Sequence, residues 1–71
     1  MVEIFKTNIS SEEQAASIVE YLQCNFPGIH FNFDLDDCDR ILRAAPSTQK
    51  MDIEAIIDTL RTFNLDCEVL E

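Results

Sequence analysis

The chain has few residues of several kinds, and each shortage argues against a class of function. Gly28 is the only glycine among 71 residues, so a glycine-rich phosphate loop cannot be built and nucleotide chemistry is excluded. Five basic residues stand against fourteen acidic ones, which gives a formal net charge of −9. Nucleic-acid binding depends on clustered lysine and arginine, so this composition disfavours it. A basic protein surface or a cation is a better electrostatic match.

Long hydrophobic runs are also missing. No apolar run approaches the roughly 20 residues that cross a bilayer, and the first residues lack the basic and apolar regions of a signal peptide. Cys24, Cys38 and Cys67 are odd in number and form no CxxC pair, so a disulfide framework is not expected. We therefore expect a cytoplasmic protein with reduced thiols and no membrane partner.

Histidine occurs once, at His30, and any Ser-His-Asp or Cys-His catalytic set would have to include it. The extended or turning chain that follows could carry Cys38 up to roughly 25 Å away, and Cys24 is expected on the outer face of a helix. A solvent-facing histidine is the better interpretation. We predict no enzyme active site and no cofactor.

The remaining sequence shows six regular elements. Apolar residues at helical spacing predict two helices, one that ends at Pro27 and Gly28 and one that begins after Asp52. Alternating apolar residues and β-branched or aromatic enrichment predict strands at residues 2–8, 29–36, 40–45 and 67–70. This order predicts one α+β domain over residues 1–71, a ferredoxin-like βαββαβ two-layer sandwich. Right-handed crossovers place both helices on one face of an antiparallel four-stranded sheet, with the first and third strands in its centre.

Local signals add detail to this fold. Ser10 with Glu13 fits a capping box at the start of the first helix, and Gln23 is expected to look outward from that helix. Asn64 is expected to end the second helix in the left-handed conformation. The inward face of the first strand stays open between two pairs, Val2 with Ile4 and Phe5 with Ile9.

Several positions around the two helices match the pattern of a known family. They are Val19 and Glu20, the helix-end motif Phe26, Pro27, Gly28 and Ile29, the second-helix residues Ile56, Ile57 and Leu60, and Asn64. In these positions the chain resembles the heavy-metal-associated domain family, the small βαββαβ modules of copper chaperones and metal-transporting ATPases. The resemblance covers nearly the whole chain and implies the same fold.

The metal motif of that family is absent from the chain. Glu12 and Ala15 stand where the family carries its two metal-binding cysteines. Two thiolates on one loop suit the soft ion Cu(I), whereas a carboxylate and a methyl group do not. The resemblance therefore implies a divergent member that has lost the CxxC copper site.

The topology brings the loops at residues 8–12, 36–39 and 64–67 to one end of the domain. We predict a non-enzymatic interaction or regulatory module that binds a basic protein surface there, or that self-associates through an edge strand. The residues predicted for the binding surface are Glu12, Glu13, Asp36, Asp37, Asp39 and Asp66.

Two alternatives remain open. Residual heavy-metal binding or sensing would use Cys38 and Cys67 with nearby carboxylates such as Glu12, although Cys67 is also expected to face inward as a core residue. The aspartates around Cys38 suit a hard cation, but they lack the glycine and glutamate of an EF-hand loop, and a solvated turn explains them. The second alternative is a small-ligand regulatory domain, which follows from fold analogy alone.

Overall fold

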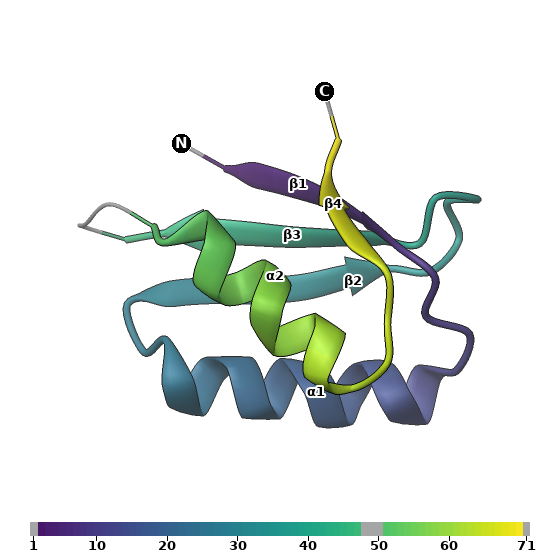
Figure 1. The fold of residues 1–71 in the computed structure, drawn as a ribbon, viewed down its shortest axis with the longest axis horizontal. Helices are drawn as coiled ribbons and strands as arrows, with labels where there is room; N and C mark the ends of the chain where they lie inside the picture. The colour runs from purple at the N-terminus through teal and green to yellow at the C-terminus, as the bar shows by residue number, and fades with distance from the viewer. Residues whose placement is uncertain (1, 48–50, 71) are drawn as a thin grey trace.

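One antiparallel sheet of four strands carries two helices on a single face (Figure 1). The computed structural model describes residues 2–47 and 51–70. In chain order the elements are β1 (Glu3–Thr7), α1 (Glu12–Asn25), β2 (Ile29–Asp34), β3 (Ile41–Pro46), α2 (Ile53–Thr62) and β4 (Cys67–Val69). The predicted α+β ferredoxin-like sandwich is confirmed. Neither helix in the described ranges is long and apolar enough to span a membrane.

The sheet order is β2-β3-β1-β4, so β1 and β3 are central, as predicted, and β2 and β4 are the edges. Every pairing in this order is antiparallel. The β2 edge has six residues and the β4 edge has three. Because β2 is the longer edge, it exposes more backbone groups to a potential partner.

β1, β2 and β4 are each one or two residues shorter than predicted, and both ends of β3 are shifted by one residue. β3 begins at Ile41 rather than one residue earlier, because Arg40 has φ 47, which is left-handed and does not fit a strand. β3 then runs on to Pro46, which lies opposite Ile29 of β2. Residues 48–50 of the loop that follows lie outside the described residues.

The hydrophobic core lies between the sheet and the helices. Phe5, Leu22, Leu42 and Leu60 come from four different elements and are each 0% exposed. Burying a side chain of this size stabilises the fold by about 1.5–3 kcal/mol. At the core's margin the rings of Tyr21 and Phe63 meet edge to face, with centroids 5.3 Å apart, and join α1 to the end of α2.

The inward face of β1 consists of Phe5 and Thr7 and continues to Ile9, which is 1% exposed. Val2 is 52% exposed and Ile4 is only partly buried. Of the two registers that the sequence left open, the structure therefore has the one that places Phe5 and Ile9 in the core.

The start of α1 corrects the capping prediction. Ser11 rather than Ser10 is the N-cap, and its hydroxyl accepts a hydrogen bond from the N–H of Gln14 at 3.2 Å. The helix starts one residue later because Ile9 must first reach the core. At the end of α2, the prediction for Asn64 is confirmed, since its φ is 62.

Candidate functional site

Three connections meet at one end of the molecule: the loop after β1, the β2–β3 hairpin and the turn before β4 (Figure 1). Thr7 joins the first two, because its N–H donates to the carbonyl of Asp39 at 3.1 Å and its hydroxyl donates to the carbonyl of Arg40 at 2.6 Å. Thr7 is buried, so water does not compete for these bonds. We call this region the acidic end, defined by Glu12, Glu13, Asp36, Asp37, Asp39 and Asp66.

Asn8 links the turn before β4 to the loop after β1. Its side-chain oxygen accepts the N–H of Asp66 at 2.9 Å, and its amide nitrogen donates to the Asp66 carboxylate at 3.3 Å. Residues 58 positions apart are thereby held together. The left-handed Asn64 turns the chain toward this contact.

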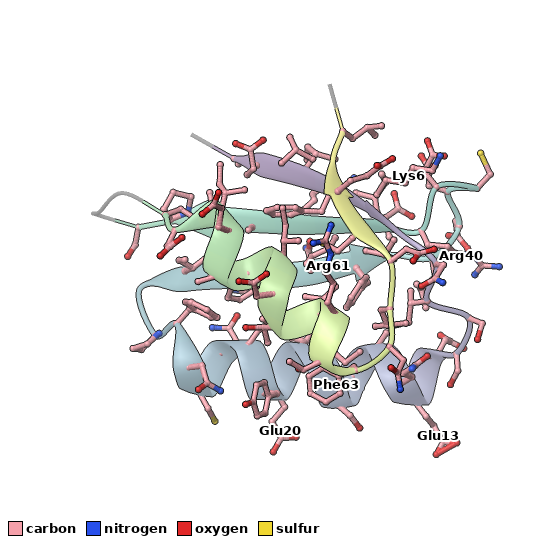
Figure 2. The ribbon with its side chains drawn as sticks, viewed as in Figure 1. Lys6, Glu13, Glu20, Arg40, Arg61 and Phe63 are labelled. Carbon is pink, nitrogen blue, oxygen red and sulfur yellow. The ribbon has the colours of Figure 1, made fainter. Side chains whose placement is uncertain are left out.

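The aspartates of the β2–β3 hairpin also shape its turn. Asp34 and Asp37 each accept a hydrogen bond from the N–H two residues further on, at 3.2 and 2.9 Å. Such bonds favour turns over strands. The Arg40 guanidinium donates to the carbonyl of Leu35 at 3.3 Å, and Figure 2 shows Arg40 at the hairpin end of the molecule.

Few ion pairs form at the acidic end, although the basic side chains of Lys6 and Arg40 lie there. Of its six residues, Asp39 alone has an ion-pair partner within the described part of the chain, Lys6 at 3.8 Å. The Lys6 side chain is 48% exposed, so this pair contributes little to stability. The other five side chains are exposed. The structure thus places all the residues predicted for the binding surface at one end of the fold.

The residues predicted to hold a metal do not form one group. Within the described ranges, the residues whose potential ligand atoms cluster are Asp37, Cys38 and Asp39, all within 4.8 Å of one another. Glu12 and Cys67 lie outside this group, and Cys67 is buried in the core. The group offers a single thiol, whereas Cu(I) binding favours two.

Cys67 is expected to be the least reactive of the three cysteines. Burial raises the pKa of its thiol from 9.0 to about 11, an effect that Arg61 partly opposes and Glu68 reinforces. Because the thiolate is the nucleophile, iodoacetamide at about pH 8 should label the exposed Cys24 and Cys38 well before Cys67. Peptide mass mapping over time measures this order, and labelling of Cys67 at the rate of Cys38 would contradict it.

The same shift predicts a dependence of stability on pH. The folded state keeps the Cys67 proton at pH values where the unfolded state loses it. The free energy of unfolding should therefore fall as the pH rises from about 9 to about 11. Urea titrations of the parent protein and of Cys67→Val at several pH values isolate this contribution. The difference between the two proteins should change across that interval and be constant below it.

A groove of about 630 Å³ lies between α1 and β2 and reaches the acidic end. The sequence analysis did not identify it. Part of its lining is apolar, and the rest is charged or polar. The apolar residues are Ala15, Ala16, Val19, Phe31, Phe33 and Leu35, and the others are Glu12, Glu20, Asn32, Asp34, Asp36 and Arg43.

Gln23 lies on the same face of α1 as the helix residues that line this groove. The prediction that its side chain faces solvent is wrong. Its amide nitrogen donates to the carbonyl of Ile29 at 2.8 Å, and its amide oxygen accepts the N–H of Phe31 at 2.8 Å. A side chain thus satisfies two backbone groups on the free edge of β2. The spacing of Ala15, Val19 and Gln23 on one helix face could have indicated that Gln23 faces this strand.

Comparisons of the chain with protein-family models, curated proteins and solved structures found no significant match. The resemblance to the heavy-metal-associated domain family therefore remains a prediction from the sequence.

Proposed function

We propose that this chain is a non-enzymatic protein-binding domain whose acidic end binds a basic protein surface. The observation that carries the proposal is the gathering of six carboxylates from the first turn of α1, the β2–β3 hairpin and the turn before β4, with an ion pair to only one of them in the described ranges. Complementary charge accelerates association and selects the partner. The hydrogen bonds of Thr7 and Asn8 hold the three segments together, so the charged surface is preorganised.

The family resemblance supports the same proposal. In heavy-metal-associated domains this end carries the metal motif, and here Glu12 and Ala15 replace its cysteines. A divergent member that keeps the fold and has lost the copper site would retain a rigid surface for a protein partner. In the cytoplasm, the compartment that we propose, the exposed Cys24 and Cys38 remain thiols.

Metal binding and small-ligand binding have less support. The Asp37, Cys38 and Asp39 group is exposed and serves the hairpin turn, and the Cys67 thiol belongs to the core. A small metabolite is usually enclosed on most of its surface. The groove between α1 and β2 is open and rimmed by carboxylates, which suits a basic chain better than an enclosed metabolite.

The test compares two variants of equal charge. Glu13→Gln with Asp37→Asn and Asp66→Asn neutralises one residue from each segment and keeps the side-chain oxygens that accept hydrogen bonds. The control, Glu3→Gln with Glu54→Gln and Asp58→Asn, removes as much charge from residues outside the acidic end. The probe is a fluorescent lysine-rich peptide, and its affinity is measured by anisotropy at low and moderate salt.

We expect the acidic-end variant to bind the peptide about tenfold more weakly than the parent protein and with a flatter salt dependence. The control variant should lose markedly less affinity. Equal losses in the two variants would mean that the peptide responds to the net charge of the protein and not to the acidic end. That result would contradict the proposal. The absence of binding by the parent protein would also contradict it.

A further inference from the structure

The free edge of β2 faces the groove. β2 pairs with β3 on one side only, and Gln23 binds the carbonyl of Ile29 and the N–H of Phe31 on the other side. The backbone groups of successive strand residues point in opposite directions. The N–H and C=O groups of Phe31 and Phe33 therefore all point away from β3, toward the open edge.

Gln23 satisfies only the first part of this edge. The C=O of Phe31 and both backbone groups of Phe33 come next along the strand, and no hydrogen bond reaches them from the described residues. Free groups of this kind can pair with an added strand. The groove lies beside them, so an incoming chain would find both hydrogen-bonding groups and a surface for its side chains.

The lining of the groove indicates which side chains would fit. On the α1 side, Ala15 and Val19 are apolar, and Ala16 leaves room because its side chain is small. The rim carries four carboxylates, from Glu12, Glu20, Asp34 and Asp36, and Figure 2 shows Glu20 on the outer side of α1. The one guanidinium of the lining, from Arg43, lies 3.3 Å from the Asp34 carboxylate. A ligand with apolar and cationic groups matches this lining.

A second copy of the chain fits the groove poorly. Pairing of two β2 edges would bring the same set of carboxylates together from both copies, each with a net charge of −9. The opposite edge, β4, has only three residues to offer as an added strand.

We infer that the groove between α1 and β2 binds a basic, extended segment of a partner protein, which adds a strand to the edge of β2. This rests on the proposed function and defines the partner's chemistry. The segment alternates apolar side chains, which face α1, with basic side chains, which point to the opposite face of the sheet, where the Asp34 carboxylate lies. Its backbone pairs with Phe31 and Phe33 beyond the position that Gln23 occupies.

The probe is a fluorescent peptide of about six residues, the usual length of a strand, that alternates lysine and valine. Two versions with the same charge carry N-methyl groups, either on every valine or on every lysine. Each set of methyl groups removes the donors along one edge of the peptide. In an antiparallel addition the valines lie opposite Phe31 and Phe33 and donate to β2, so methylated valines should weaken binding about tenfold and methylated lysines should not. If the methylated lysines weaken binding and the methylated valines do not, the peptide adds to β2 in the parallel orientation. Equal affinity of the two methylated peptides would overturn the inference.

A pair of helix variants tests the place of binding. Ala16→Arg puts a long cationic side chain into the groove between Glu12 and Glu20, one helical turn away on each side. Ser17→Arg makes the same charge change at an exposed neighbour that does not line the groove. Arginine and alanine are both good helix formers, so the fold should persist, and circular dichroism checks this. We expect Ala16→Arg to weaken peptide binding about tenfold and Ser17→Arg to weaken it far less.

The outcomes separate this inference from the proposed function. If the acidic-end variant weakens binding while both methylated peptides and Ala16→Arg bind as well as their references, the inference fails and the proposed function stands. If the alternating peptide does not bind the parent protein, the inference fails outright. Sedimentation experiments test whether the parent protein forms a dimer. A dimer that Ala16→Arg abolishes would mean that the groove binds a second copy of the chain, and the inference of a basic partner segment would be wrong.

Discussion

Replacing Phe5 with alanine should reduce the free energy of unfolding by about 3–5 kcal/mol. Phe5 is 0% exposed in the central strand β1, where it lies opposite Leu42 of β3 and Val69 of β4. Removal of its ring leaves a cavity in the core that neighbouring side chains refill only in part. At about 0.05–0.15 kcal/mol per residue, a chain of this length has only about 4–11 kcal/mol in total. The Phe5→Ala loss is therefore a large share of the total stability, and the variant should unfold at a much lower urea concentration than the parent protein.

Phe63→Ala is the matched control. The Phe63 side chain is as large, but the residue is 37% exposed and its ring contacts Tyr21 at the margin of the core. We expect a loss of about 1 kcal/mol from this contact. Urea titrations followed by circular dichroism measure both losses. Similar losses in the two variants would mean that Phe5 does not hold the central place in the core that its burial indicates.

Replacing Thr7 with valine should cost about 2 kcal/mol, although valine has the same shape. The lost hydroxyl donates to the carbonyl of Arg40 at 2.6 Å and accepts the N–H of Ile9 at 3.3 Å. Both backbone groups would be left without this partner at a buried position. Arg40 is also the left-handed residue that ends the hairpin turn, so its loss of support should loosen the acidic end.

Thr7→Ser separates the hydroxyl from the methyl group. Serine keeps the two hydrogen bonds and loses one methyl, which should cost about 0.8 kcal/mol. Hydrogen exchange of the Ile9 amide, which donates to the Thr7 hydroxyl, distinguishes the variants together with urea titration. Faster exchange in Thr7→Val and near-parental exchange in Thr7→Ser would support the hydroxyl's role. Equal destabilisation by both changes would assign the role of Thr7 to packing.

The elements with a strong period were predictable from the sequence. β2 alternates clearly, α2 has an apolar stripe with Asp52 as its N-cap, and the order of the elements then determines the sheet topology. The same topology brings the acidic residues to one end without any information about side-chain contacts. This is why the candidate binding surface could be proposed before the structure was known.

The edge of β2 was less predictable. Gln23 is polar and lies on a helix, which usually places a side chain in solvent, and its two bonds to β2 depend on the position of α1 over the strand. The register of β1 was ambiguous for a related reason: the strand has apolar residues on both faces. Ile9, beyond the end of the strand, resolves it by entering the core.

The contact between Tyr21 and Phe63 gives the chain a built-in spectroscopic reporter. The sequence has one tyrosine and no tryptophan, so near-ultraviolet fluorescence of the native protein comes essentially from Tyr21. Its ring meets Phe63 where α1 approaches the end of α2, 5.3 Å from centroid to centroid. A change in that emission reports a change in the surroundings of Tyr21 at the contact between the helices, whereas far-ultraviolet circular dichroism reports loss of the helices themselves. Comparison of the two signals during unfolding shows whether this contact changes before the helices melt, without any label on the protein.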